Sequence, residues 1–324
     1  MCSIRIDRRL FGAKRDVNSG RLLLAWACLS PWLAAQEMPP ARQSKAVEAS
    51  YSEEESASVS PRLAQKEADL RADIAERPQS AELLYSLALL LRQEGKARES
   101  LDMYTRAAQL RAPGASELHL VALDYVLLND YEDAIHWLER AAKMEPGNVP
   151  VLYSLGRCYF SKDRYLEAER MFTHVLALDP KNLKAEENLG LVFDATNHTA
   201  QAEDALRTAA SWADKHAQDE WPFLDLGGFL LDHGRAQEAI DPLRTAVSIR
   251  ADCATCHEKL GRALLTTRVL DEGIMELEKA VKLDSSNPKM HYELGRALRM
   301  GGQAERAQQE FAASQKLYAA HSQE

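Results

Sequence analysis

The chain has 324 residues, of which 46% are hydrophobic and 27% are charged, and its formal net charge is −9. This composition excludes a disordered acidic chain, and the charge disfavours a nucleic-acid-binding protein, which needs a surplus of lysine and arginine. Glycine (15) and proline (12) make up about 8% of the residues, below the roughly 12% of average proteins, so helices are favoured over many turns.

The first 35 residues have the pattern of a secretory signal peptide. Residues 1–21 carry six basic and two acidic side chains, and residues 22–35 carry no charge and end in small residues. A basic lead before a short apolar stretch is typical of export signals, and the stretch is too short to span a bilayer. We expect this segment to be removed and the mature protein to be periplasmic or secreted. The alternative is a frayed basic terminus followed by a buried helix.

A linker and a short helix are expected next. Residues 36–60 contain few large apolar side chains and many Ser, Glu and Ala, so we expect a disordered linker. From Pro61 the apolar residues Leu63, Leu70 and Ile74 can share one face, and Arg77-Pro78 ends the pattern. Residues 61–78 are therefore expected to form an N-terminal capping helix.

An internal repeat of 34 residues dominates the rest of the chain. One apolar column recurs at this spacing, with a single interval of 37, at Leu87, Val121, Leu155, Leu189, Leu226, Leu260 and Leu294. A small residue follows each of these positions directly, and a large apolar residue follows four positions later, as in a helix. Each window has a second small-then-large pair, such as Ala239 and Leu243, so it encodes two amphipathic helices whose backbones can approach closely.

The period and these columns resemble the tetratricopeptide repeat (TPR) family. The window 149–182, with Leu155-Gly156, Tyr159, Ala168 and Phe172, is the most typical. The resemblance implies an all-α, right-handed superhelical solenoid of tandem TPR helix hairpins over residues 81–321. The expected windows are 81–114, 115–148, 149–182, 183–216, 220–253, 254–287 and 288–321.

The family resemblance also implies that the first helix of each pair lines a concave groove that binds another protein or a peptide. The residues expected to face this groove are Tyr153, Arg157, Phe160, Lys259, Arg262, Tyr292, Arg296 and Arg299. Since arginine pairs with carboxylates through two hydrogen bonds, the basic C-terminal part of this set suits an acidic partner. Ordinary solvated charges without a dedicated ligand are the alternative.

One motif carries chemistry of its own. Cys253, Cys256 and His257 match C-x-x-C-H, the signature of covalent c-type haem attachment, in which two thiols bond the haem and the histidine holds the iron. Its position at the start of a repeat helix favours a structural role, either as a disulfide or as two buried thiols. A single C-x-x-C pair lacks the second pair of ligands that a structural zinc site needs.

The sequence as a whole predicts an exported, non-catalytic scaffold without a cofactor. Its expected partner is another protein or peptide segment, with no nucleic acid and no membrane span. A redox protein that carries haem at residues 253–257 is the alternative. We expect no further helix after Tyr318, so Phe311, Leu317 and Tyr318 are expected to be partly exposed, and self-association through the C-terminal repeat is also expected.

Overall fold

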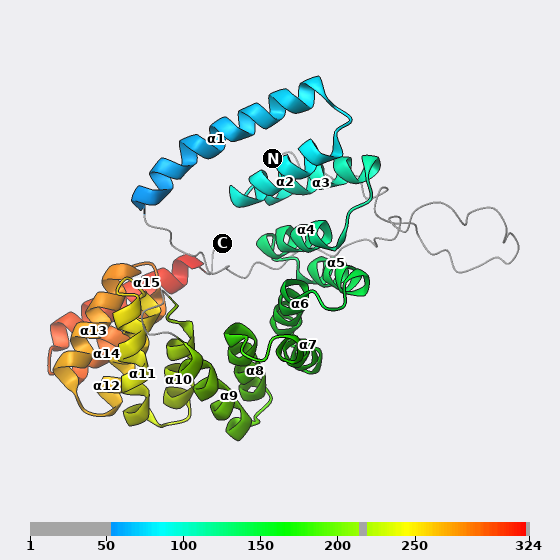
Figure 1. Cartoon of the computed structure of the whole chain (residues 1–324). Helices are drawn as coiled ribbons and strands as arrows, with labels where there is room; N and C mark the ends of the chain where they lie inside the picture. Colours follow the sequence, from blue (N-terminus) through cyan, green and yellow to red (C-terminus); the bar gives the residue numbers. More distant parts are fainter. Residues whose placement is uncertain (1–52, 214–218, 322–324) are drawn as a thin grey trace, which may run out of the picture. The chain divides into compact units, whose positions relative to one another are not determined.

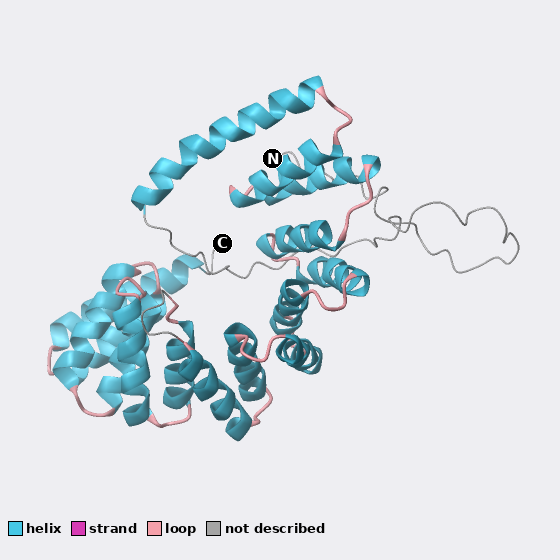
Figure 2. Cartoon of the chain, in the orientation of Figure 1, coloured by secondary structure: helices cyan, strands magenta, loops and turns pink. Residues whose placement is uncertain are grey.

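The computed structural model describes residues 53–213 and 219–321, and every regular element in this part of the chain is an α-helix (Figure 2). The described residues divide into two compact units, unit 1 up to Lys162 and unit 2 from Asp163 onward. The proposed signal peptide and residues 36–52 of the linker lie outside the described residues.

The residues of unit 1 that the structure describes form six helices (Figure 1). They are α1 (Glu53–Glu76), α2 (Ala81–Gln93), α3 (Ala97–Leu110), α4 (Ala115–Leu127), α5 (Tyr131–Met144) and α6 (Val149–Ser161). Unit 2 contains nine helices among its described residues. They are α7 (Tyr165–Leu178), α8 (Leu183–Ala195), α9 (Thr199–Trp212), α10 (Trp221–Asp232), α11 (Ala236–Ile249), α12 (Ala254–Thr266), α13 (Leu270–Leu283), α14 (Pro288–Met300) and α15 (Ala304–His321).

Helix α1 differs from the expected linker and capping helix. It begins at Glu53, eight residues before Pro61, and ends at Glu76. The reason is physical: residues 53–55 are all glutamate, and glutamate is a good helix former. Its C-terminal half is attached to the first repeat through buried Ile74 and through ion pairs from Glu67 to Lys96 (2.7 Å) and from Arg71 to Glu99 (3.1 Å).

The turns inside the hairpins all use a left-handed residue. Gly95, Gly234 and Gly302 have φ of +73°, +76° and +74°, and Asn129, Asp163 and Asn197 have φ between 57° and 60°. Glycine, asparagine and aspartate are residue types that tolerate this conformation. The turn between α12 and α13 uses Arg268, at φ 68°, where the sequence has no glycine or asparagine. An arginine in this conformation carries a steric cost that glycine avoids.

The small and large columns meet inside the hairpins, as the sequence pattern predicts. A Cβ added at Gly190, Gly227, Gly261 or Gly295 would lie 2.5–2.8 Å from the large side chain sixteen residues later. Those large side chains are Leu206, Leu243, Leu277 and Phe311. The first three are fully buried, so each hairpin core depends on a glycine that lets a leucine pack directly on the backbone of the neighbouring helix.

Unit 1 holds a buried carboxyl group at Asp124 in α4, which is 0% exposed. Ser100 Oγ lies 2.8 Å from the Ala88 carbonyl oxygen and 2.6 Å from Asp124 Oδ2. A hydroxyl has one hydrogen, so when Ser100 donates it to Ala88, only a protonated Asp124 can complete the second bond. Burial raises the pKa of Asp124 to about 7, which fits a carboxyl group that keeps its proton near neutral pH.

This carboxyl group makes the stability of unit 1 dependent on pH. The folded state holds a proton that the unfolded state releases near pH 4, so the free energy of unfolding falls as pH rises from about 4 to 7. The slope is at most about 1.4 kcal/mol per pH unit. We expect Asp124→Asn to remove this slope, as measured by urea denaturation at several pH values. An unchanged slope in the variant would contradict the assignment.

Candidate functional site

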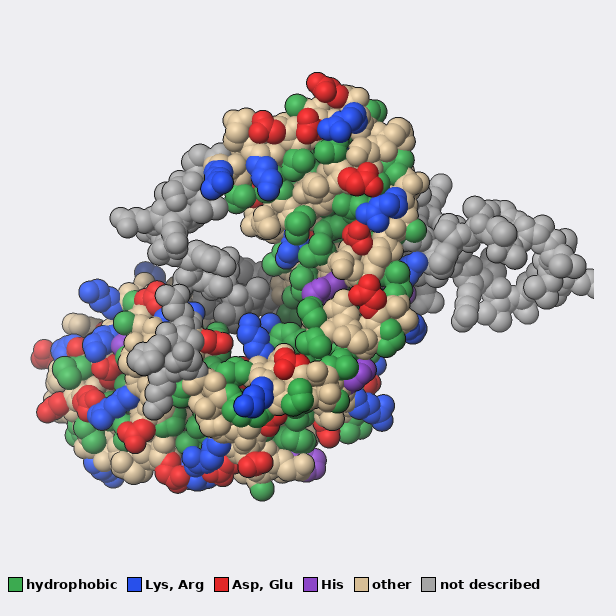
Figure 3. All heavy atoms as spheres, in the orientation of Figure 1, with side chains coloured by type: hydrophobic (Ala, Val, Ile, Leu, Met, Phe, Trp, Pro, Cys, Tyr) green, Lys and Arg blue, Asp and Glu red, His purple; other side chains and the backbone are tan. Residues whose placement is uncertain are grey.

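The first helices α12 and α14 in unit 2 form the most cationic surface among the sequence-predicted positions. Together they carry five lysine and arginine residues against two glutamates. We call this the α12–α14 surface, and it is formed by Lys259, Arg262, Lys289, Tyr292, Arg296 and Arg299. On the face drawn in Figure 3, acidic and basic side chains are interspersed over unit 2, so the cationic excess is local.

A buried glutamate organises this surface. Glu258 in α12 is 2% exposed, and its Oε1 lies 3.5 Å from an Arg262 nitrogen and 3.3 Å from Lys289 Nζ. Arg262 also reaches Asp232 at the end of α10 (3.6 Å). The network therefore ties three successive first helices together. A buried charge needs partners of opposite sign, and Arg262 and Lys289 supply them through ion pairs in which Glu258 Oε1 accepts no hydrogen bond.

The end of the surface combines cations with aromatic rings. Tyr292 is 48% exposed, and its ring centroid lies 5.6 Å from that of Phe311. The Arg299 guanidinium lies 5.6 Å from the centroid of the Phe311 ring, within the range of a cation–π contact. Arg296 is exposed and pairs with Glu293 at 3.0 Å. Carboxylates of a partner would meet exposed arginines beside aromatic rings here.

The other three predicted residues belong to α6 in unit 1. Arg157 is exposed, whereas Tyr153 and Phe160 are half-buried. They lie on one helix of unit 1, whereas the α12–α14 surface belongs to unit 2. At the C-terminal end, Tyr318 is exposed and Leu317 is half-buried. Self-association through this end stays a prediction, which sedimentation at high concentration can test.

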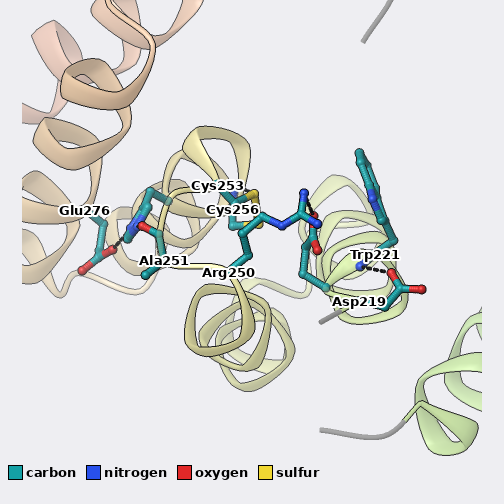
Figure 4. The surroundings of a disulfide bond; sticks show 9 residues. Asp219, Trp221, Arg250, Ala251, Cys253, Cys256 and Glu276 are labelled. Carbon is teal, nitrogen blue, oxygen red and sulfur yellow. Dashed lines mark hydrogen bonds and ion pairs between the residues drawn. A yellow bond between two sulfur atoms is a disulfide. The ribbon is translucent and has the colours of Figure 1, made fainter. Parts of the chain in front are cut away.

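The C-x-x-C-H motif is a disulfide followed by a tightly held histidine (Figure 4). Cys253 and Cys256 are bonded to each other. His257 is buried, with Nδ1 at 2.5 Å from Glu276 Oε2 and Nε2 at 3.0 Å from the Ala251 carbonyl oxygen. Haem attachment would need both sulfurs and a free ring nitrogen of His257. The residues as arranged do not fit a haem.

The next repeat explains why His257 is structural. His291 makes the same two contacts, from Nδ1 to Glu310 Oε2 (2.6 Å) and from Nε2 to the Ser285 carbonyl oxygen (3.1 Å). Both the histidines and the glutamates are 34 residues apart, so each histidine ties the turn before its hairpin to the second helix. This spacing is visible in the sequence and could have revealed the role of His257.

A second carboxyl cluster was not predicted. Glu187 in α8 is 6% exposed and shares a hydrogen bond with Asp225 in α10. Burial and the neighbouring carboxylates Asp225 and Asp219 raise the pKa of Glu187 to about 9, while Lys184 opposes the shift. Burial also raises the pKa of Asp225, and the positive charge of Lys259 partly offsets this increase. One proton shared by this pair removes the repulsion between the two helices.

Two protein-family models match the chain. Residues 98–175 match the model for subunit 3 of the anaphase-promoting complex (cyclosome), and residues 258–322 match a tetratricopeptide repeat model. The BBSome complex member BBS4 of Xenopus tropicalis is 29% identical over 102 residues, covering 32% of this chain and 20% of the relative. The anaphase-promoting complex subunit CDC16 of Saccharomyces cerevisiae is 24% identical over 206 residues, covering 60% of this chain and 22% of the relative. The chain thus spans about a fifth of the length of these relatives.

Solved structures show the same fold at low identity. A tetratricopeptide repeat protein from Parabacteroides merdae has a TM-score of 0.61 at 19% identity, covering 76% of this chain and 96% of that protein. The Cut9-Hcn1 hetero-tetramer also has a TM-score of 0.61, at 14% identity, covering 79% of this chain and 50% of the matched chain. The structure repeats helix hairpins with left-handed turns and, in unit 2, glycine-leucine contacts. The family models and the solved structures agree with this architecture. The chain is a tetratricopeptide repeat protein.

Proposed function

We propose that this protein is an exported, non-catalytic scaffold that binds an acidic segment of a partner protein through the α12–α14 surface. The observation that carries the proposal is the excess of five cations over two carboxylates on these helices. Lys289 and Arg296 have side chains that are 57% and 49% exposed, so carboxylates can reach them. Relatives named as members of the BBSome and the anaphase-promoting complex are consistent with a role in protein assembly.

The buried Glu258 supports binding by preorganisation. Its charge attracts both Arg262 and Lys289, so these side chains have less conformational freedom to lose when a ligand arrives. The cations nevertheless remain partly exposed, and Tyr292 adds a flat surface beside them. An acidic segment that contains an aromatic or apolar residue would use both features.

Export is supported by the basic and then apolar N-terminal sequence, since that order is typical of signal peptides. A disulfide between Cys253 and Cys256 agrees with an oxidising compartment, where such bonds persist. No described helix is both long enough and apolar enough to cross a membrane.

Calorimetric titration with synthetic peptides tests the proposal. We expect the full-length chain to bind a glutamate-rich peptide, and we expect the affinity to fall with rising salt because the contacts are ionic. A lysine-rich peptide of the same length is the matched control and should give no binding. Equal binding of the two peptides, or binding that salt does not change, would contradict the proposed surface.

A further inference from the structure

The N-terminus of α12 differs from those of its neighbours in the atom that caps it. The N-cap residue of α6, α8 and α14 is an asparagine: Asn148, Asn182 and Asn287. In each case the side-chain oxygen accepts a backbone N–H. In α12 the capping residue is Cys253, whose Sγ accepts the backbone N–H of Cys256 at 3.1 Å. A sulfur atom therefore occupies the position that an amide oxygen occupies at the start of these three helices.

This position favours a negative charge on Cys253 when the disulfide is reduced. The free N–H groups and the dipole at a helix N-terminus stabilise a thiolate and lower the pKa of a cysteine. Arg250 lies beside the disulfide in Figure 4, but Glu220 pairs with it at 2.9 Å. Exposed Asp252 weakly opposes the charge. The helix terminus is thus the main source of stabilisation, since both ring nitrogens of the adjacent His257 are already engaged.

The two sulfurs differ in access. Cys256 is 0% exposed and packs in the core formed with α10 and α11, whereas Cys253 is only partly buried at the edge of that core. An incoming thiol can reach Cys253 but not Cys256. The remaining described cysteine, Cys158, is buried without a disulfide, and burial raises its pKa to about 12. It serves as an internal example of an inert thiol.

We propose that Cys253 and Cys256 form an exchangeable disulfide that reacts with thiols through Cys253. The thiolate of an external thiol attacks Cys253 Sγ, the sulfur–sulfur bond breaks, and Cys256 leaves with the electron pair and takes up a proton. A second external thiol then attacks the mixed disulfide and releases the Cys253 thiolate. The chain gains two electrons, and the two external thiols are oxidised to a disulfide.

The hairpin keeps its structure in both states. Cys253 Sγ can accept the Cys256 N–H with or without the disulfide, so the helix cap survives reduction. The disulfide closes a ring that includes only four residues, and the stabilisation from such a crosslink grows with the length of the closed loop. The disulfide therefore adds little to the stability of the folded state. Its reversible chemistry distinguishes the N-terminus of α12 from those of the other helices.

Equilibration of the full-length protein in glutathione redox buffers tests the proposal, with acid quenching, alkylation and mass spectrometry. We expect Cys253 and Cys256 to pass together from oxidised to reduced while circular dichroism stays native. In the reduced protein, Cys253 should react with iodoacetamide at pH 7 at least about tenfold faster than Cys256 and Cys158, because it is only partly buried and lies at the helix N-terminus. A disulfide that excess reduced glutathione opens only after urea unfolds the chain would overturn the proposal.

Two matched variants identify the reacting sulfur. With glutathione disulfide, Cys256→Ala should form a glutathione adduct at Cys253, whereas Cys253→Ala should form none at the buried Cys256. Equal adducts in both variants would show that the exposure difference does not govern the reaction. If either variant fails to fold, the alkylation rates of the unmodified protein decide the question, and equal rates at Cys253 and Cys158 count against it.

Discussion

Leu243→Ala is expected to lower the free energy of unfolding of unit 2 by about 2–5 kcal/mol, because the change leaves a cavity in a closed core. Leu243 is fully buried and packs directly on the backbone of α10 at Gly227. Urea denaturation followed by circular dichroism measures the loss. A loss below about 1 kcal/mol would show that the hairpin can close around the missing side chain.

The glycine on the other side of this contact makes the test specific. A Cβ at Gly227 would lie 2.5 Å from Leu243 Cγ, so Gly227→Ala alone is expected to cost about 1–3 kcal/mol. In the Leu243→Ala background the added methyl group fills part of the cavity, and the double variant should lose less than the sum of the two. Additive losses would contradict direct contact between the two residues.

The next residue of the same helix is the control. A Cβ at Gly228 would meet only the flexible end of Lys259 among its nearest neighbours. Since alanine is favoured over glycine in a helix interior by up to about 1 kcal/mol, Gly228→Ala should be neutral or stabilising. A destabilising effect equal to that of Gly227→Ala would mean that any side chain on this stretch of α10 is harmful.

Reversing the charges of Arg262 and Arg296 is expected to weaken binding of an acidic peptide by at least about 100-fold. Each charged hydrogen bond contributes about 1.5–3 kcal/mol, and 1.4 kcal/mol corresponds to a tenfold change in affinity. Fluorescence anisotropy with a labelled glutamate-rich peptide measures the loss for Arg262→Glu with Arg296→Glu. Since Arg262→Glu places a second carboxylate beside Glu258, the milder pair Arg262→Gln with Arg296→Gln guards against misfolding.

The matched control reverses two arginines on second helices. Arg244 in α11 and Arg306 in α15 pair with Glu272 and Glu278, so Arg244→Glu with Arg306→Glu changes the net charge equally. Peptide affinity should fall much less in this control. A similar loss in both double variants would mean that the peptide responds to total charge and not to the α12–α14 surface.

The repeat architecture could be predicted because each hairpin repeats the same local physics. The glycine at Gly227 and the leucine at Leu243 stand at fixed offsets, and their contact needs no information from distant parts of the chain. Two local features escaped the pattern. Arg268 makes a left-handed turn without a turn residue, and α1 starts at Glu53 in a segment whose composition suggests disorder.

The candidate site was less predictable, since it depends on burial and pairing. The position of Arg262 follows from the period, but the sequence does not indicate that buried Glu258 pairs with both Arg262 and Lys289. The shared proton of Glu187 and Asp225 joins residues that are 38 positions apart, across the irregular 37-residue interval. The sequence favoured a structural role for His257 but left haem ligation open, because its two hydrogen-bond partners, Glu276 and Ala251, are not part of the motif.

Site-specific photo-cross-linking in the native host tests whether a partner protein binds at the α12–α14 surface. A photoreactive phenylalanine analogue would replace Tyr292 on the α12–α14 surface or, as a control, Met275 on the second helix α13, which is 52% exposed. We expect a discrete protein adduct at residue 292. This adduct should be absent at residue 275, and it should be lost when the charges of Arg262 and Arg296 are reversed. Adducts of equal intensity at both positions, or an adduct at residue 292 that survives the charge reversal, would contradict binding at this surface.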